Sequence, residues 1–533
     1  MTGCADPGER EGFAPTATRG YILISLDTLR TDRLGAYGGD FGTSPFLDRL
    51  SSEATVFESA TAPYPSTLVS HMSMFTGLYP PQHGVYPPYS ALRPSVPTLG
   101  EKFAAGGFRT QGHTEGGFVA AGYGFERGFE VYDDTVLFDD SDIERTFERG
   151  LSFLDSLQSD ERFFLFLHTY SAHDPYDPPA RFVEQFGDSE PGPLSKGERL
   201  RDFNLGQEAI TPAEVERFGL RYSASVRYVD SVLESFVTDL GSRGLLEETT
   251  LVITSDHGEE FLEHGRLGHT QLFPETLGVP LIIVHPGQSV GQRISDEVSL
   301  VDVAPTLISL AGLPPLEQAA GRSLEPYLRN PHLERPIRVY AEVDDLGLLG
   351  RSLTGGVDGT RYLLRVAQWQ PDADGSWVLE EGAEMDYFES RLEFRSRSYD
   401  STRRVTVLAD GVEVAVLEIG TDWQDLALDL PGEGLKRLTL QPDGCSRPID
   451  RGEGRDSRCL SFIIKGPPVS TIELFDLDAD PRATMDVSRS RPLVARRLIR
   501  DLLARQFEQV SAPEFRELTE EDTERLRDLG YLD

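Results

Sequence analysis

Lysine, cysteine and long apolar runs are all scarce in this chain of 533 residues. Acidic residues outnumber Lys and Arg by 88 to 51, which gives a formal net charge of −37, and the lysines are only Lys102, Lys196, Lys436 and Lys465. This negative charge argues against nucleic acid as a partner and disfavours a flat anionic membrane surface, because both would repel the protein. No run of about 18 apolar residues exists, so the sequence predicts no bilayer-spanning segment.

The three cysteines indicate an oxidising compartment. Met1-Thr2-Gly3-Cys4 resembles the last residues of a bacterial lipoprotein signal, in which the cysteine becomes the lipidated N-terminus. Cys445 and Cys459 flank a Gly/Arg/Asp-rich loop, and a disulfide between them would contribute about 3 kcal/mol. We therefore expect an extracytoplasmic protein, a periplasmic lipoprotein that meets the membrane only through a lipid on Cys4. A chance match at Cys4 and two unrelated buried thiols are the alternatives.

The pattern of apolar residues predicts an α/β fold. Residues 21–26, 163–167 and 249–255 are mostly apolar runs of the kind that form strands buried on both faces. Helical periodicity separates them, most clearly over 142–157 and 211–240. Repeated alternation of strand and helix predicts a doubly wound, mainly parallel sheet with helices on both faces.

Near residue 372 the sequence changes in character. Residues 404–416 are typical of a hairpin, with an Asp-Gly turn between two alternating strands. We interpret 380–465 as a small all-β, jelly-roll-like module inserted into the α/β body. The expected domains are an N-terminal tether over 1–18, the α/β catalytic domain over 19–370, the inserted β-sandwich over 371–468, and a strand and helix over 469–533 that pack back on the α/β domain.

The stretch Ser66 to Gly77 is the most informative for chemistry. It follows a proline-containing segment and starts a short helix, so the hydroxyl of Thr67 would sit at a helix N-terminus, where an anionic ester can bind and be attacked. Asp27 and the pair Asp256-His257 each follow a predicted buried strand, at the edge where open α/β sheets bind ligands. Oxygen ligands with one imidazole suit a single Ca²⁺, Mg²⁺, Mn²⁺ or Zn²⁺ ion, which would activate the hydroxyl.

Four further histidines are candidates for the rest of the site. Hydrolysis of a sulfate or phosphate ester needs groups that bind the non-bridging oxygens and an acid for the leaving group. His71, His83, His173 and His269 could supply these groups. Other residues are expected to act only in packing or in orienting the site, namely His113, His168, His264 and Glu259. Each candidate has a structural alternative, for example Thr67 as a helix cap and His83 as a loop residue.

Several motifs in a fixed order carry a resemblance to a known family. They are residues 26–38 (LDTLRTDRLGAYG), 75–80 (FTGLYP) followed by His83-Gly84, 255–259 (SDHGE), 301–307 (VDVAPTL) and 473–477 (ELFDL). Over residues 19–370 and 471–486 the chain resembles the sulfatase family of the alkaline phosphatase superfamily. The resemblance implies a metal-dependent enzyme that cleaves sulfate or phosphate esters.

The departures from the family pattern bear on the reaction. Sulfate-cleaving members make a formylglycine from Cys or Ser in C/S-x-P-x-R, where this chain has Thr67, Val69 and His71. The family's first acidic pair is Asp27-Thr28 here, its Asp-Asn is Asp256-His257, and His269 stands where a lysine is usual. His173 matches a histidine of the family that contacts the ester. The resemblance therefore implies that His173 and His269 bind the non-bridging oxygens, with His71 or His83 as the acid. The set resembles relatives that transfer phosphoryl groups through a threonine.

The resemblance therefore favours a hydrolase that acts through Thr67, with phosphate esters preferred over sulfate esters. The substrate would be a small molecule or an ester on a glycan or lipid. A phosphoryl-group transferase, or a degenerate member that binds glycans or lipids without turnover, is the alternative. The sequence does not indicate an oligomeric state.

Overall fold

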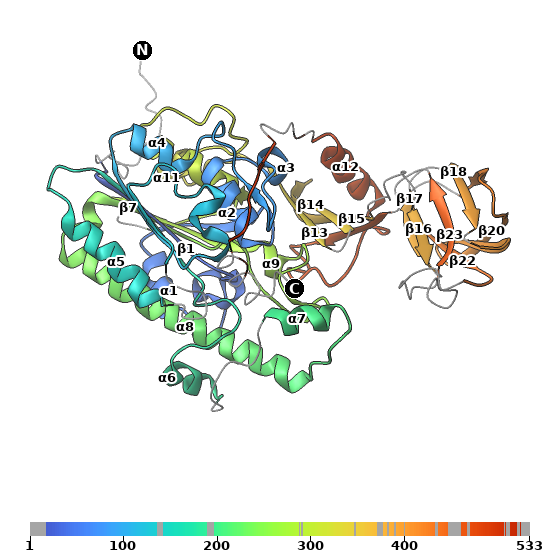
Figure 1. The fold of residues 1–533 in the computed structure, drawn as a ribbon, viewed down its shortest axis with the longest axis horizontal. Helices are drawn as coiled ribbons and strands as arrows, with labels where there is room; N and C mark the ends of the chain where they lie inside the picture. Colours follow the sequence, from blue (N-terminus) through green and yellow to red (C-terminus); the bar gives the residue numbers. More distant parts are fainter. Residues whose placement is uncertain are drawn as a thin grey trace, which may run out of the picture. The chain divides into compact units, whose positions relative to one another are not determined.

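The computed structural model describes residues 18–519 and 523, apart from 136–141, 189–196, 287, 289–290, 346–347, 370–376, 381–382, 388–390, 399, 432–434, 446–459, 466–469, 506 and 508–511. The chain forms two compact units, Met1–Ala341 with Gln506–Asp533, and Glu342–Arg505 (Figure 1). The predicted tether, Cys4 and Cys459 lie outside the described residues, whereas Cys445 is described and is disulfide-bonded.

The first unit is built on a nine-stranded sheet in the order β11-β2-β10-β7-β1-β6-β4-β5, with β12 paired to β2. Strands β7, β1, β6, β4 and β5 pair in parallel with one another, while β10 is antiparallel to both β2 and β7. The predicted parallel sheet is thus confirmed. The strands are β1 (Gly20–Leu26), β2 (Thr55–Thr61), β4 (Arg109–His113), β5 (Val131–Asp133), β6 (Phe163–Thr169), β7 (Thr249–Thr254), β10 (Gly278–Val284), β11 (Gln292–Ile294) and β12 (Val298–Ser299).

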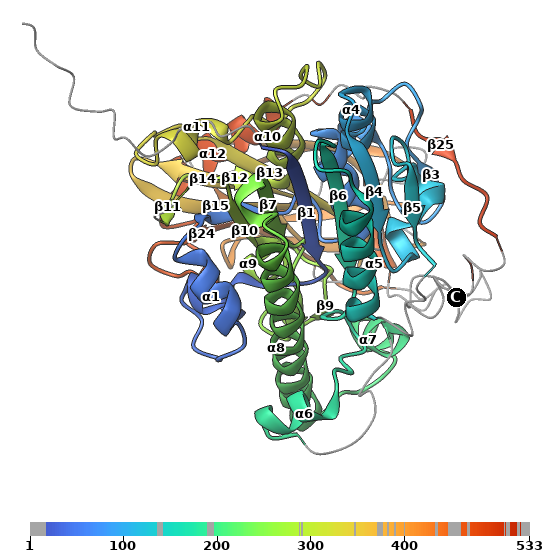
Figure 2. The ribbon, with the colours of Figure 1, turned by 90° about the vertical axis from the view of Figure 1, so that its left-hand side faces the viewer.

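Helices cover both faces of this sheet, as predicted, because alternate residues of each buried strand point to opposite faces. Tyr21 and Leu23 of β1 face a core shared with α2 (Thr67–Thr76), α4 (Leu99–Ala105) and α10 (Val303–Leu310). Ile22 and Ile24 face a second core shared with α5 (Ile143–Ser156) and α8 (Pro212–Ser242). Figure 2 shows α5 and α8 side by side along the sheet.

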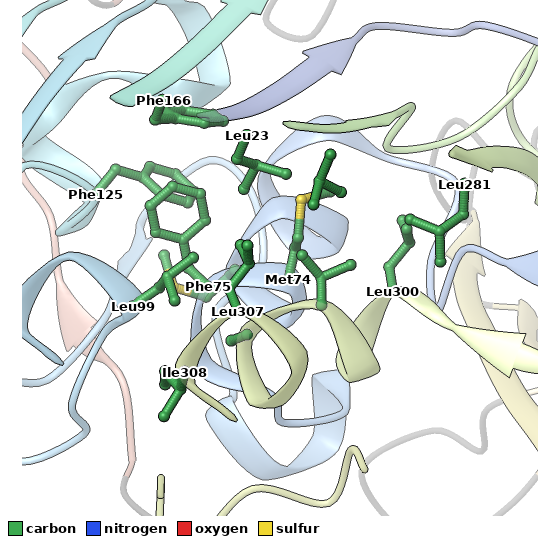
Figure 3. Packing of buried hydrophobic residues seen from close by; sticks show 14 of the residues in the cluster. Leu23, Met74, Phe75, Leu99, Phe125, Phe166, Leu281, Leu300, Leu307 and Ile308 are labelled. Atoms are coloured by element: carbon green, nitrogen blue, oxygen red, sulfur yellow. The ribbon is translucent and has the colours of Figure 1, made fainter. Parts of the chain in front are cut away.

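The core over α2 fixes the position of the helix that carries the candidate nucleophile. Every residue of α2 is buried. Figure 3 shows Met74 and Phe75 of α2 meeting Leu307 of α10, Leu23 of β1 and Phe166 of β6. The shorter elements of the unit are α1 (Pro45–Ser51), α3 (Pro80–His83), α6 (Ala180–Val183), α7 (Gly197–Asn204), α9 (Pro274–Leu277), α11 (Glu325–Arg329), β3 (Ser90–Ala91), β8 (Glu260–Phe261), β9 (Leu267–Gly268) and β25 (Glu514–Phe515).

The second unit contains antiparallel sheets. One has the order β13-β14-β15-β24, formed by β13 (Arg338–Asp345), β14 (Leu348–Val357), β15 (Thr360–Trp369) and β24 (Ser470–Asp476), and α12 (Pro492–Leu503) follows. The predicted domain boundaries at 370/371 and 468/469 both fall inside this unit. They do so because β15 and β24, which flank the boundaries, pair with each other from Tyr362↔Asp476 to Gln368↔Ser470.

Two further sheets of four strands face each other as a sandwich. Their orders are β16-β23-β18-β21 and β17-β22-β19-β20. The strands are β16 (Trp377–Glu380), β17 (Ala383–Tyr387), β18 (Arg391–Ser398), β19 (Arg403–Ala409), β20 (Val412–Ile419), β21 (Gln424–Asp429), β22 (Lys436–Pro442) and β23 (Leu460–Lys465). Phe394 and Leu428 of one sheet share a core with Val407 and Leu440 of the other. The predicted β19–β20 hairpin is confirmed, with positive φ at Asp410 (50°) and Gly411 (81°), as its two-residue turn requires.

None of the helices in the described part of the chain has the length and apolar character needed to cross a membrane.

Candidate active site

Three segments distant in sequence meet at the carboxyl ends of β1 and β7. These two strands pair in parallel, with Ser25 opposite Thr254, so the residues that follow them lie at the same edge of the sheet. Asp27 follows β1, and Asp256 comes two residues after β7. Thr67 is the first residue of α2, and its N-cap, Ser66, has an extended backbone (φ −159°, ψ 138°). The sheet edge and the helix N-terminus thus form one site.

The four predicted metal-site residues are adjacent and fully buried. Thr67 Oγ1 lies 3.3 Å from Asp27 Oδ2 and 3.4 Å from His257 Nε2. His257 Nε2 also lies 3.4 Å from Asp256 Oδ2. Ligand atoms of Asp27, Asp256 and His257 all lie within 4.8 Å of one another. Two carboxylates, an imidazole and a hydroxyl form a donor set that suits a hard or borderline divalent cation.

The hydrogen bonds of the two carboxylates also fit a cation. Asp256 Oδ1 accepts bonds from the backbone N–H of His257 (2.9 Å) and of Thr28 (3.3 Å). In contrast, Asp27 Oδ1 and Asp256 Oδ2 are buried and have no hydrogen-bond partner among the described residues. Buried carboxylate oxygens of this kind are normally neutralised by a partner or a metal ion. The residues present therefore fit one divalent ion.

The two carboxylates have opposite pKa shifts. Burial and the neighbouring charge of Asp256 raise the pKa of Asp27 well above its ordinary value. Burial also acts to raise the pKa of Asp256, but His257 and His71 outweigh it and hold that pKa below its ordinary value. Of the two carboxylates, Asp27 therefore takes up a proton more readily in the absence of a cation, and a divalent cation bound there would favour the ionised form.

His173 and His269 lie together beside the metal-site residues. The ring of His269 is 4.4 Å from that of His257 and 5.3 Å from that of His173. His269 Nδ1 is 3.2 Å from Glu259 Oε1, and His173 Nδ1 donates to the carbonyl of Asp174 at 2.6 Å. Burial lowers the pKa of each histidine to about 4, so both are neutral at pH 7. Glu259 is also buried, where it orients His269.

The structure does not leave His71 as a proton donor to a ligand. Its Nδ1 lies 2.8 Å from the carbonyl oxygen of Thr67, which can only accept, so Nδ1 carries the proton. Its Nε2 lies 2.9 Å from Ser25 Oγ, which therefore donates to it. Burial keeps the pKa of His71 below its ordinary value. His71 joins the first turn of α2 to β1 and so holds the backbone of Thr67.

His83 is not brought into this cluster. Its Nδ1 accepts from the backbone N–H of Val85, and its Nε2 bonds to Ser73 Oγ, both at 3.0 Å. Ser73 is six residues beyond Thr67, so His83 contacts the later turns of α2 instead of its N-terminus. Neither histidine expected to serve as the acid has a ring nitrogen directed to a leaving group.

Sequence reasoning missed His168, which we expected to act only in packing. It lies on β6 opposite Ser25 of β1, and its Nε2 is 3.2 Å from Asp27 Oδ2. Its ring is 4.9 Å from that of His71. The available signal was its place near the carboxyl end of an apolar strand. Its nearness to Asp27 follows only from the pairing of β1 with β6.

Thr28 supports the site through its backbone. Its φ of 56° is rare for a β-branched residue, and strain of this kind is concentrated at functional sites. The hydroxyl of Tyr222, on α8, donates to Thr28 O at 2.7 Å and accepts from the N–H of Arg30 at 2.9 Å. Helix α8 thereby fixes the turn that directs Asp27 and the N–H of Thr28 toward Asp256.

Comparison with known proteins places this site in a family. The sulfatase family model matches residues 19–313. Arylsulfatase K of Bos taurus is 24% identical over 408 residues, which cover 67% of this chain and 75% of the relative. Among solved structures, BT4656 in complex with its substrate D-glucosamine-2-N,6-O-disulfate has a TM-score of 0.60 at 15% identity, covering 91% of this chain and 97% of that one. The phosphonate monoester hydrolase of Agrobacterium radiobacter has a TM-score of 0.60 at 16% identity, covering 91% and 95%.

The fold and the family match define the class of the protein. The chain belongs to the sulfatase family, since the family model spans more than half of it. It is a sulfatase-like ester hydrolase with an alkaline phosphatase-like α/β unit and a C-terminal unit of antiparallel sheets.

Proposed function

We propose that this enzyme is a metal-dependent hydrolase that cleaves phosphate esters in preference to sulfate esters, with the Thr67 hydroxyl as its nucleophile. The observation that carries the proposal is the position of Thr67 Oγ1, 3.3 Å from Asp27 Oδ2 and 3.4 Å from His257 Nε2 at a buried helix start. Helix N–H groups beside it favour an anionic ester. The completeness of the buried ligand set favours catalysis over a degenerate, binding-only role.

Asp27, Asp256 and His257 would hold the ion together with Thr67. A divalent ion bound there supplies the positive charge that lowers the pKa of a coordinated hydroxyl. Thr67 Oγ1 attacks the phosphorus or sulfur atom in line with the leaving oxygen, and Asp27 Oδ2 accepts the hydroxyl proton. The bond to the leaving oxygen breaks, and the leaving oxygen takes up the proton that Thr67 gave to Asp27. Water then cleaves the Thr67 ester and restores the hydroxyl.

His173 and His269 would bind the non-bridging oxygens. Both use Nδ1 in internal bonds, to Asp174 O and to Glu259 Oε1, which leaves Nε2 as the basic nitrogen. Each must therefore take up a proton at Nε2 before it can donate to an oxygen of the ester. A bound anionic ester favours that uptake because it stabilises the imidazolium form.

The preference for phosphate is supported by the nucleophile and by the absence of lysine from the sequence motifs that form the site. Hydrolysis of a phosphate ester on threonine regenerates the free hydroxyl. An unmodified threonine can therefore serve as the nucleophile in phosphoryl transfer. None of the four lysines falls in a motif. Relatives named arylsulfatase and a fold neighbour named phosphonate monoester hydrolase show which esters should be assayed.

Substitution at Thr67 tests the proposal. Thr67→Ala removes the only proposed nucleophile, so we expect a loss of about 10⁴-fold or more in kcat, in line with removal of a covalent nucleophile in other hydrolases. Thr67→Ser is the matched control, because it keeps a hydroxyl and should keep most of the turnover. The assay compares aryl phosphate, bis-aryl phosphate, aryl phosphonate and aryl sulfate at equal concentrations.

Full turnover by Thr67→Ala would refute the nucleophile. Faster turnover of aryl sulfate than of every phosphorus ester would refute the preference. Addition of an alcohol acceptor tests transfer directly, because a phosphorylated alcohol would identify the enzyme as a transferase. A purified, active protein without a bound divalent ion would refute the metal requirement.

A further inference from the structure

His168 is a buried histidine beside the metal site that the proposed reaction does not use. It lies on β6, and its Nε2 is 3.2 Å from Asp27 Oδ2. The same oxygen lies 3.3 Å from Thr67 Oγ1. The Nδ1 atom of His168 is buried and has no hydrogen-bond partner in the described part of the chain. One carboxylate oxygen therefore interacts with two groups, and the other, Oδ1, is left for a cation.

The surroundings determine which nitrogen of His168 carries the proton. With the proton on Nε2, the ring donates to the carboxylate, and Nδ1 is a buried acceptor without a bond. With the proton on Nδ1, a buried N–H would have no acceptor, and the Nε2 lone pair would face the lone pairs of Asp27. A buried donor without a partner costs free energy, and the facing lone pairs add repulsion. The Nε2–H form is therefore favoured.

We propose that His168 is a positioning residue for the metal: its Nε2–H holds Oδ2 of Asp27 so that Oδ1 faces the cation. This inference rests on the proposed metal site and deepens it. His71 differs, because it contacts the carbonyl of Thr67 and Ser25 and so positions the helix. Outer groups that orient a metal ligand typically change metal affinity by about 10–100-fold when removed.

Two amide variants of the full-length protein test the proposal. The Nε2 of glutamine can take the place of the histidine Nε2, whereas the shorter asparagine cannot reach Asp27. We expect His168→Gln to bind Mn²⁺ and Zn²⁺ nearly as tightly as the parent, and His168→Asn to bind them about 10–100-fold more weakly. Affinity is measured on metal-stripped protein by competition with a chromophoric chelator. His113→Gln is the control, since His113 is a buried histidine on the neighbouring strand β4 and bonds to Gln111.

A second measurement needs no variant. Nitrogen-15 NMR of the Zn²⁺-loaded parent, in which Asp27 is ionised, reports the histidine tautomers, and we expect the Nε2–H form for His168. This measurement still tests the inference if His168→Asn does not fold.

Several results would overturn the inference. These are an Nδ1–H tautomer of His168, parent-like affinity of His168→Asn, or equal losses in the glutamine and asparagine variants. Parent protein that binds none of Ca²⁺, Mg²⁺, Mn²⁺ and Zn²⁺ would refute the metal site and this inference together. A turnover-competent Thr67→Ala protein would refute only the nucleophile, because the metal affinities are measured without turnover.

Discussion

The buried histidines of the α/β unit differ in what their ring nitrogens contact. His257, His269 and His173 lie next to one another, and each uses Nδ1 in a bond to a nearby carbonyl or carboxylate oxygen. In His71 and His83 both ring nitrogens are hydrogen-bonded within the protein, and His168 contacts Asp27 through Nε2. A count of histidines in sequence cannot separate these groups. The separation depends on which backbone carbonyls and hydroxyls surround each ring after folding.

His83 gives a prediction about stability and pH. Burial lowers its pKa from 6.5 to about 3, so between these values the unfolded chain binds one proton that the folded protein does not. Stability is therefore lost as the pH falls from about 6.5 toward 3, by up to about 1.4 kcal/mol per pH unit for this group. His83→Gln should unfold with a pH slope smaller by about that amount between pH 6 and 4.5.

Urea unfolding of the parent and of His83→Gln at several pH values measures the two slopes. Equal slopes would show that His83 is already charged or exposed in the folded protein. Turnover at pH 7 should persist in His83→Gln, because the residue contacts Ser73 and Val85 and none of the proposed metal ligands.

At the level of single elements, the stability of α2 depends on the residue that caps its C-terminus. Gly77 closes the helix at φ 69°, and a Cβ there would lie 2.9 Å from the Cβ of Ala319. Gly77→Ala should therefore lower the free energy of unfolding by about 1–3 kcal/mol, through backbone strain and the close contact. Chemical denaturation measures the change. Metal affinity at low temperature should persist, since the substitution is at the opposite end of α2 from Thr67.

Gly219 in α8 is the matched control. It has no atom within 4 Å of an added Cβ, so Gly219→Ala should be neutral or stabilising by up to about 1 kcal/mol. Equal stabilities of Gly77→Ala and Gly219→Ala would show that α2 does not need a glycine at its left-handed C-cap.

The elements that sequence predicted well are the strongly apolar ones. Predicted strands at 21–26 and 163–167 correspond to Gly20–Leu26 and Phe163–Thr169, and the helix expected over 211–240 is Pro212–Ser242. The helix predicted within 469–533 is Pro492–Leu503. Periodicity locates an element reliably, whereas its last turn depends on packing and capping.

The candidate site was only partly predictable for a related reason. Asp27, Asp256, His257 and Thr67 were found because each stands at a recognisable junction between a strand or loop and the next segment. His168 was missed because it lies beside Asp27 only in the observed pairing register of β1 with β6. The sequence of neither strand determines that register by itself. The same applies to His71, whose partners are Thr67 O and Ser25.

For the whole molecule, the division into two compact units predicts how metal removal acts. All proposed ligands belong to Met1–Ala341, and the second unit has its own core. We expect calorimetry to show two transitions, because each unit has its own hydrophobic core. A chelator should lower only the midpoint of the first unit, because that unit holds all the proposed ligands. Loss of an ion present at 100 times its Kd removes about 2.7 kcal/mol from the free energy of unfolding.

Chelator saturated with the metal beforehand is the control for non-specific effects. Equal shifts of both transitions, or a shift of neither, would contradict the assignment of the metal to the first unit.

The helical geometry of α2 limits the insertions and deletions that the chain can accept on either side of Thr67. Each residue of an α-helix turns the next side chain by about 100°, and Thr67 and His71 are four residues apart on one face. A one-residue insertion after Thr67 and before His71 would rotate the ring of residue 71 away from its carbonyl partner. A deletion within residues 63–66 would instead pull the hydroxyl off the sheet edge. Homologues that keep this chemistry should therefore keep the spacing between residues 63 and 71.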